Sequence, residues 1–399
     1  MLNVAAALHL DKPNSLPQAG EGRSALPFPD PWILIAGLLL LALGLLMVAS
    51  ASMPIADRQT GQPFYFLIRQ GAFVLVGLIA AGLMFQVPMT RWRRLGPMLL
   101  IAAIGLLVLV LIPGIGTEVN GSMRWIRLGP LNFQVSELDK LFALIYVASY
   151  LKRHSVELQN PHFSISALAL LRPIAVLAVL LLLEPDFGSV VVLMATAMGM
   201  IFLAGASLWQ FGILASGAAA AMAVLIWSSP YRLARLLSFR NPWEDPFGSG
   251  FQLTQSLIAI GRGELFGVGL GESVQKLFYL PESYTDFIFA VLAEELGLAG
   301  VLVILALFMT IVFRAFHIGQ RAERVDMKFS AWLAYGIGLW FGIQSLFNMG
   351  VNMGLLPTKG LTLPFMSYGG SSIVINRIAI AILLRIDWEN RLKRRGLNA

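Results

Sequence analysis

Long runs of apolar residues, separated by short polar segments, occupy most of this chain of 399 residues. A helix needs about 20 mainly apolar residues to cross a bilayer. The clear candidates are residues 32–51, 66–87, 95–112, 187–204, 208–227, 287–313 and 331–349. Weaker candidates, shortened or interrupted by polar residues, are 138–151, 165–183 and 371–386. The pattern predicts an all-α, polytopic membrane protein of about ten transmembrane helices.

Basic residues indicate the orientation of these spans. They follow the second, fourth, eighth and tenth predicted spans, within residues 91–94, 152–153, 314–328 and 385–395. Because positively charged loops stay in the cytoplasm, both termini are expected there, and residues 228–286 form a large extracytoplasmic loop between helices 7 and 8. The predicted organisation is a flexible cytoplasmic tail (1–31), an integral membrane domain (32–386) and a basic cytoplasmic tail (387–399).

Composition narrows the function classes. Hydrophobic residues make up 57% of the chain and charged residues only 13%, which excludes an ordinary soluble protein. The net charge of +7 comes from clusters beside apolar runs, so it indicates contact with anionic lipid rather than nucleic acid. The chain has no cysteine, which excludes disulfides and thiol catalysis.

Asp286 is the first candidate for chemistry. It stands where the longest external loop enters an apolar run, and a carboxylate at that border is costly unless something pairs or uses it. It could act as a general base, as a metal ligand or as a helix cap. At helical spacing it shares a face with Ala290, Ala293 and Gly297, a strip of small residues that leaves room for a ligand or for close helix packing.

Other charged residues allow two interpretations each. Glu137 and Lys140 are three positions apart, so they form an internal ion pair or Lys140 points a cation into a cavity. Glu184 and Asp186 form a solvated turn or bind a substrate or metal. Arg377, inside the last span, anchors a carboxylate such as Glu294 or Glu295, or it neutralises a phosphate.

The predicted external segments also carry positive charge, which is unusual on that side of a membrane. The basic residues there are Arg124, Arg127, Arg262, Lys276 and Lys359. Arginine and lysine commonly bind phosphates, so a pyrophosphate-linked lipid is a suitable anionic partner. The sequence contains no P-loop and no dinucleotide-binding glycine motif, so nucleotide hydrolysis is not supported.

With these residues in view, the sequence resembles the SEDS family, which includes FtsW, RodA and SpoVE. The matching motifs are Arg-Trp-Ile at 124–126, Phe-Gln-Val-Ser-Glu-Leu-Asp-Lys at 133–140, Glu-Pro-Asp-Phe-Gly at 184–188, Gln-Ser-Leu-Ile-Ala at 255–259, Gly-Arg-Gly at 261–263, Leu-Pro-Glu at 280–282, Thr-Asp-Phe-Ile-Phe at 285–289, Leu-Pro-Thr-Lys-Gly at 356–360 and Ser-Tyr-Gly-Gly-Ser-Ser at 367–372. One departure is Val135, where the family has proline. The long N-terminal tail and residues 271–277 are more similar to the cell-division branch of the family than to the elongation branch.

The resemblance implies a peptidoglycan glycosyltransferase that polymerises lipid II at the outer face of the bacterial cytoplasmic membrane, at the division septum, and releases undecaprenyl pyrophosphate. Asp286 matches the essential aspartate of the family, so it is expected to be the catalytic base or to act with a divalent metal, Mg²⁺ or Mn²⁺. The substrate contacts are then expected among Lys140, Glu137, Arg124, Arg262, Lys276, Glu282, Lys359, Ser367 and Ser371.

The resemblance also implies partners. The division members act with a class B penicillin-binding transpeptidase, FtsI, and with the regulatory proteins FtsQ, FtsL and FtsB. Two other functions stay open from the sequence alone: a lipid II flippase, and a noncatalytic scaffold that recruits the transpeptidase. A flippase is expected to carry polar residues through the whole membrane depth, whereas here they concentrate in the predicted external segments.

Overall fold

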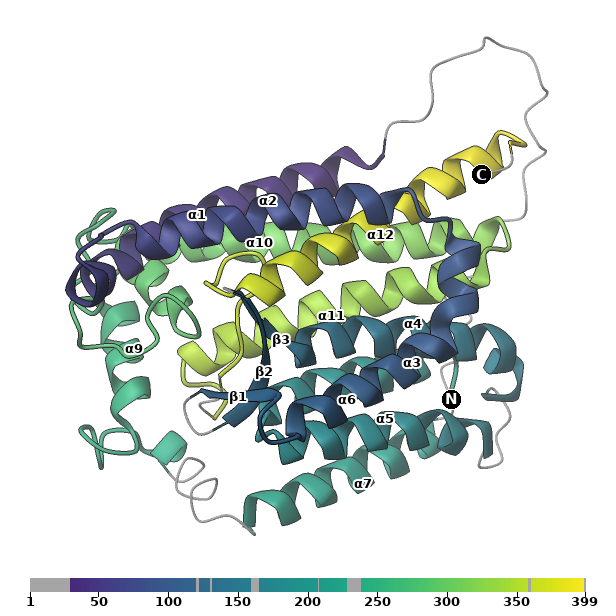
Figure 1. Cartoon of the computed structure of the whole chain (residues 1–399), viewed down its shortest axis with the longest axis horizontal. Helices are drawn as coiled ribbons and strands as arrows, with labels where there is room; N and C mark the ends of the chain where they lie inside the picture. Colours follow the sequence, from purple (N-terminus) through teal and green to yellow (C-terminus); the bar gives the residue numbers. More distant parts are fainter. Residues whose placement is uncertain are drawn as a thin grey trace.

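The protein is a bundle of long helices with a small β-sheet at one end (Figure 1). The computed structural model describes residues 29–119, 122–129, 131–158, 165–206, 208–227, 238–357 and 360–397. Most of the predicted N-terminal tail, part of the large loop (228–237) and Lys359 lie outside these residues. The mostly helical prediction is confirmed.

The helices have the following bounds: α1 Pro31–Thr60, α2 Tyr65–Phe85, α3 Met89–Leu111, α4 Val135–Leu158, α5 Ile165–Leu183, α6 Phe187–Leu203, α7 Leu208–Trp227, α9 Phe251–Arg262, α10 Ile288–Arg324, α11 Lys328–Asn352 and α12 Gly370–Arg394. The strands are β1 Gly116–Val119, β2 Ser122–Leu128 and β3 Leu131–Gln134.

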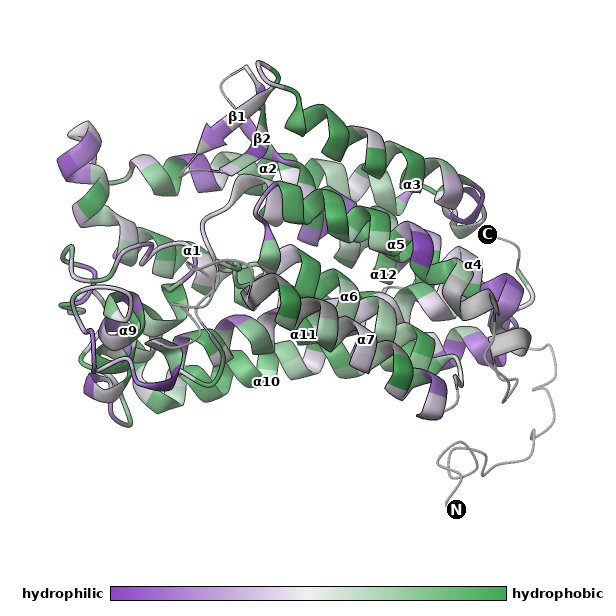
Figure 2. Ribbon diagram, turned by 90° about the horizontal axis from the view of Figure 1, so that it is seen from below, coloured by the Kyte–Doolittle hydropathy of each residue, from purple (hydrophilic) through white to green (hydrophobic). Residues whose placement is uncertain are grey.

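The apolar composition of the helices fits a multi-pass membrane protein. Among the described residues, α1, α2, α3 and α10 are each long and apolar enough to cross a bilayer by length and composition alone. The segments Ala169–Leu183 and Phe187–Leu203 are shorter apolar helices. Hydrophobic residues follow the lengths of the helices, whereas hydrophilic residues gather on β1 and β2 and near helix ends (Figure 2). The number of about ten spans and their orientation stay predictions.

The small sheet is the part of the fold that the prediction of an all-α protein did not contain. Its strands pair antiparallel in the order β1-β2-β3, with Trp125 opposite Gln134 in the β2–β3 register. Strand β3 continues directly into α4. The backbone N–H of Gln134 donates to Oγ of Ser371 at 2.7 Å, which ties the sheet to the start of α12. We call this end of the bundle the sheet end.

The segment between α11 and α12 folds back into the bundle at the sheet end. Leu363, Phe365 and Met366 in this segment are buried. A Cβ atom on Gly44 of α1 would lie 2.6 Å from Cα of Met366, so only glycine permits this close approach. A buried loop needs partners for its backbone groups. One is the Ser367 side chain, whose Oγ accepts the N–H of Leu363 at 2.8 Å.

Candidate active site

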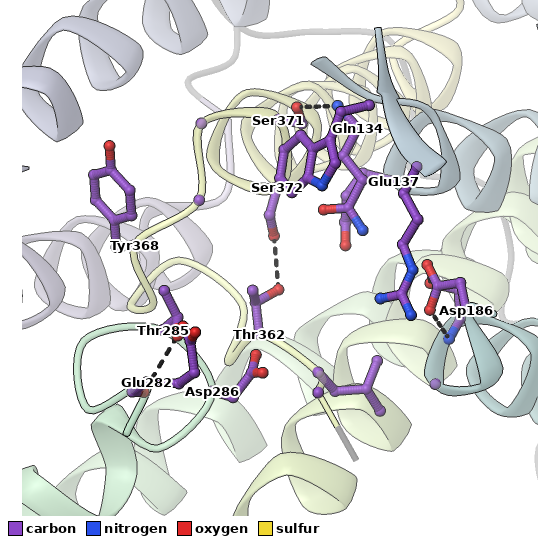
Figure 3. Close-up of a pocket in the computed structure, with 18 of the residues that line it drawn as sticks. Gln134, Glu137, Asp186, Glu282, Thr285, Asp286, Thr362, Tyr368, Ser371 and Ser372 are labelled. Atoms are coloured by element: carbon purple, nitrogen blue, oxygen red, sulfur yellow. Dashed lines mark hydrogen bonds between the residues drawn. The ribbon is translucent and has the colours of Figure 1, made fainter. Parts of the chain in front are cut away.

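A cavity of about 820 Å³ opens at the sheet end of the bundle (Figure 3). Its lining is rich in polar side chains, which are Arg69, Ser122, Arg124, Asn132, Gln134, Glu137, Asp186, Ser189, Gln252, Glu282, Tyr284, Thr285, Asp286, Thr362, Tyr368, Ser371 and Ser372. Such a large polar cavity within an apolar bundle indicates a site for a polar ligand.

The cavity is surrounded by the N-terminal ends of helices. Helices α2, α4, α6, α9, α10 and α12 each contribute lining residues from their first turns or from the residues just before them. Helix N-termini carry partial positive charge and unpaired N–H groups, and they attract anions. The helix ends therefore add a favourable field for phosphate to a cavity that also contains the cations of Arg69 and Arg124.

Asp286 lies at the entry to α10, half-buried, with its side chain among the lining residues (Figure 3). The N-cap position of α10 belongs to Phe287, so the interpretation of Asp286 as the cap of this helix is wrong. The backbone carbonyl of Asp286 accepts hydrogen bonds from Nδ2 of Asn348 at 2.9 Å and from Nδ2 of Asn352 at 3.1 Å. The carboxylate is thus presented to the cavity from a held backbone.

The turn before Asp286 supplies further polar groups. Oγ1 of Thr285 donates to Oε2 of Glu282 at 2.6 Å. Glu282 has a φ of 55°, in the left-handed region that a non-glycine residue adopts only under constraint from its surroundings. Tyr284 packs against Phe66 and Tyr368, with ring centroids 4.8 and 5.6 Å away. Burial raises the pKa of Tyr284 to about 12, so its hydroxyl remains a hydrogen-bond donor at neutral pH.

The opposite wall is formed by β2 and the turn between α5 and α6. Arg124 donates from Nε to the carbonyl of Glu184 at 3.0 Å and from Nη2 to the carbonyl of Pro185 at 2.6 Å. Asp186 caps α6 by accepting from the N–H and Oγ of Ser189, at 3.2 and 2.8 Å. Burial and the neighbouring Asp186 raise the pKa of Glu184 to about 8.

Glu137 and Lys140 form the ion pair that their spacing predicted, with Nζ of Lys140 2.9 Å from Oε1 of Glu137. Nζ also donates to Oε1 of Gln344 at 2.9 Å and lies 5.4 Å from the ring centroid of Trp340. Lys140 is buried, and only Glu137 lines the cavity. The structure therefore presents the acidic member of the pair, rather than the cation, to a ligand.

Two further predicted cations are also paired with carboxylates away from the cavity. Nζ of Lys276 lies 2.8 Å from Oε1 of Glu295, and Nη1 of Arg262 lies 3.2 Å from Oε1 of Glu294. Neither Lys276 nor Arg262 is among the described residues that line the cavity. Arg377 does not anchor Glu294 or Glu295, so that interpretation is wrong, because Arg262 and Lys276 hold these carboxylates.

The structure thus brings together part of the predicted set. Asp286, Glu137, Arg124, Glu282 and Ser371 line the cavity, and Ser367 lies beneath its wall in the backbone contact with Leu363. The sequence reasoning missed Arg69, Tyr284, Thr362, Tyr368 and Ser372. Arg69 had a usable signal, because it is the one basic residue within the apolar run 66–87.

A helical membrane protein with a polar cavity at one end, lined by carboxylates and faced by helix N-termini, is the class that this fold and site define. The chain belongs to the FtsW/RodA/SpoVE family of cell cycle proteins, whose sequence profile matches residues 31–392. The family resemblance seen in the sequence motifs is confirmed.

Individual relatives and solved structures agree with this assignment. Proteins named probable peptidoglycan glycosyltransferase FtsW are 55% identical to the chain in Nitrosococcus halophilus (92% of this chain, 94% of the relative) and 50% identical in Legionella pneumophila (97% and 98%). A chain from the structure of a peptidoglycan synthase complex, described as coordinating polymerization and crosslinking, superposes with a TM-score of 0.73, at 28% identity, over 91% of this chain and 98% of that chain. The rod shape determining protein RodA of Thermus thermophilus superposes with a TM-score of 0.66, at 28% identity, over 90% and 96%.

Proposed function

We propose that this protein is a peptidoglycan glycosyltransferase that polymerises lipid II into glycan strands during septal cell-wall synthesis. The observation that carries the proposal is the placement of the Asp286 carboxylate in a cavity that is faced by helix N-termini and contains Arg69 and Arg124. The names of the relatives support the same activity. For this activity the sheet end, where the cavity opens, faces the outside of the cytoplasmic membrane, and the positions of the basic loops predict that orientation.

The chemistry matches the arrangement of groups. The 4-hydroxyl oxygen of one sugar attacks the anomeric carbon of another, and Asp286 accepts the hydroxyl proton. The bond from the anomeric carbon to the pyrophosphate breaks, and its electron pair leaves with undecaprenyl pyrophosphate. The helix N-termini and the two arginines stabilise the charge that develops on this leaving group.

A divalent metal fits this donor set as an ion shared with the substrate. The described residues contain no group of three or more histidine, cysteine or acidic side chains that could hold a metal. Mg²⁺ is commonly bound by one or two carboxylates together with substrate phosphates. Asp286 would supply the carboxylate, and the ion would supply neutralising charge at the pyrophosphate.

The remaining walls of the cavity suit a sugar substrate. Aromatic rings of Tyr284 and Tyr368 offer faces for sugar rings, and Thr362 and Ser372, whose hydroxyl oxygens lie 3.2 Å apart, offer hydrogen bonds. Among the substrate contacts expected from the sequence, Arg124, Glu137, Glu282 and Ser371 are therefore proposed, with Arg69 added. Ser367 is proposed to shape the wall through its contact with Leu363.

The proposed partners are those of the division branch. A class B transpeptidase, FtsI, would cross-link the strands, and FtsQ, FtsL and FtsB would regulate the pair at the septum. The superposed synthase complex, which is described as coordinating polymerization with crosslinking, supports a transpeptidase partner.

The activity is tested with the full chain purified together with its transpeptidase, lipid II and Mg²⁺ or Mn²⁺. We expect glycan strands from the wild type and none from Asp286→Asn, with equal thermal stability of the two proteins. Equal polymer from both proteins would remove Asp286 from the mechanism. Transfer of lipid II across vesicles without polymer would favour a flippase.

A further inference from the structure

The side-chain amide of Asn352 is inserted into the first turn of α10. Its Nδ2 donates to the backbone carbonyl of Asp286 at 3.1 Å, and its Oδ1 accepts the backbone N–H of Ala290 at 3.2 Å. In an uninterrupted α-helix, the N–H of residue 290 would donate directly to the carbonyl of residue 286. Here α10 begins only after its N-cap Phe287, so that N–H lies 3.0 Å from the carbonyl of Phe287, and the Asn352 amide bridges it to the Asp286 carbonyl just before the helix.

Asn348 adds a second amide one turn earlier on α11. Its Nδ2 donates to the same carbonyl of Asp286 at 2.9 Å, and also to the carbonyl of Leu361. Both asparagines are buried, with exposed fractions of 2% for Asn348 and 0% for Asn352. Nδ2 of Asn352 also donates to the backbone carbonyl of Asn348 at 2.8 Å. The two side chains form one unit because both donate to the Asp286 carbonyl.

This unit is itself anchored from two sides. Oγ of Ser256 in α9 donates to the backbone carbonyl of Asn352 at 2.8 Å, which holds the end of α11. The contact from Asn348 to Leu361 reaches the residue after Gly360, and Gly360 lies against the Asp286 carboxylate. The backbone of Asp286 is therefore fixed to α11, and through it to α9 and the segment after Gly360.

We propose that Asn348 and Asn352 are positioning residues, an amide clamp that sets the place of the Asp286 carboxylate in the cavity. The inference rests on the proposed function, because it assigns the clamp to the same reaction. By bridging the Asp286 carbonyl to the N–H of Ala290, the clamp holds Asp286 just before the N-cap of α10, where its side chain meets the cavity. Neither asparagine lines the cavity among the described residues, so the clamp acts through the lining residues it holds, Asp286 and Leu361.

The clamp requires an amide at position 352 because that side chain is both donor and acceptor. An ionised carboxylate of the same shape has no donor, so Asn352→Asp would place a negative oxygen against the Asp286 carbonyl. Buried polar groups left facing without a hydrogen bond are costly. The first turn of α10 would then rearrange and carry Asp286 with it. A displacement of about 1 Å is enough to lower turnover by about 100-fold.

The test uses the full chain with its transpeptidase partner and compares wild type, Asn352→Asp, Asn348→Ala and Ser345→Ala. Ser345 is a matched control, because it is buried on the same helix and, within the described part of the chain, its Oγ bonds the carbonyls of Phe341 and Gly342 of its own helix, at 2.7 and 3.1 Å. Two readouts are needed: the rate of lipid II polymerisation at varied substrate concentration, and hydrogen exchange of peptides that contain residues 286–291.

We expect Asn352→Asp to lower kcat by about 10- to 100-fold, with KM within about twofold of the wild type, since the substrate contacts are intact. Exchange at residues 286–291 should rise in both clamp variants and stay at the wild-type level in Ser345→Ala. Asn348→Ala, which removes one of two donors, should give a smaller loss of kcat. If Asn352→Asp fails to fold, Asn348→Ala carries the test.

The proposal is overturned if the folded clamp variants keep wild-type kcat, or if KM alone changes. It is also overturned if exchange in residues 286–291 does not rise. An inactive wild type would contradict the proposed glycosyltransferase function, whereas the exchange measurement would still report whether the clamp holds Asp286.

Discussion

Gly360 lies directly against the carboxylate of Asp286, and a Cβ atom at position 360 would be 2.7 Å from Oδ2. Two segments far apart in the chain therefore approach so closely that a side chain at position 360 would displace the carboxylate. On its other side, the backbone of Asp286 is held by Asn348 and Asn352. The carboxylate is thus placed by a steric limit and a pair of amides acting together.

Gly360→Ala should displace the Asp286 side chain and lower polymerisation by about 10-fold or more, because the added methyl group occupies the space of Oδ2. The thermal midpoint should change little, since the flexible acid can move toward the open cavity. Steady-state polymerisation of lipid II measures the effect. Gly71→Ala on α2 is the control, because a Cβ there meets nothing within 4 Å. Full activity in Gly360→Ala would show that the position of the carboxylate is not critical.

Arg69→Gln should weaken substrate binding. Arg69 lines the cavity. Its Nη1 donates to the hydroxyl oxygen of Tyr65 at 3.0 Å, which holds the Arg69 side chain near the N-terminal end of α2. Loss of one charge-assisted contact to phosphate costs about 1.5–3 kcal/mol. KM for lipid II should therefore rise by about 10-fold or more, whereas kcat changes less. Arg58→Gln, outside the cavity lining, serves as the comparison, and an equal rise of KM there would indicate a general charge effect.

Lys276 is expected to act on stability rather than on substrate. Its ammonium is buried 2.8 Å from Oε1 of Glu295 and also donates to Oγ of Ser50 at 2.9 Å. Removing one member of a buried pair leaves the other charge uncompensated, at a cost of about 3–5 kcal/mol. Lys276→Met should therefore lower the thermal midpoint of the purified protein markedly, and the double change with Glu295→Gln should recover part of the loss. A stable Lys276→Met protein with a raised KM for lipid II would instead indicate that Lys276 contacts the substrate.

The sequence allowed the contents of the cavity to be predicted better than its geometry. Asp286, Glu137 and Ser371 stand at the boundaries of apolar runs, and every second boundary must lie at the same face of a membrane. Arg124 lies in the segment between two such boundaries on that face. Their convergence could therefore be predicted without knowing how the helices pack. The chemical role of Asp286 came from the family motif, because an acid at a membrane border is equally consistent with capping.

The pairing of charges could not be predicted in the same way. Lys276 and Arg262 were expected to face an anionic ligand, but α9 and the loop after it pack against α10 and bring them to Glu295 and Glu294. Helices that are apolar on all sides give no periodic signal for which face turns inward. The sheet was missed for a related reason, since its short strands lie in a segment that was interpreted as an external loop.

Glu184 should make the stability of the protein depend on pH. It lies in the turn between α5 and α6, where burial and the neighbouring Asp186 raise its pKa to about 8, whereas Arg124 acts in the opposite direction. In the unfolded chain the pKa is near 4.5, so between about pH 4.5 and 8 the folded state binds the extra proton. The contribution of this group to the free energy of unfolding is therefore highest below about pH 4.5 and falls as pH rises to about 8, by at most about 1.4 kcal/mol per pH unit.

Glu184→Gln removes the ionisable group and keeps its shape. The variant should not lose stability through ionisation at position 184. The difference between its thermal midpoint and that of the wild type should therefore grow from about pH 5 to about pH 8 and then remain constant. Thermal unfolding in detergent at a series of pH values measures the difference, with Glu272→Gln, an exposed loop carboxylate, as the control. Parallel pH profiles for wild type and Glu184→Gln would mean that Glu184 ionises at its ordinary pKa in the folded protein. Unchanged polymerisation by Glu184→Gln would show that the ionisable group takes no part in the reaction.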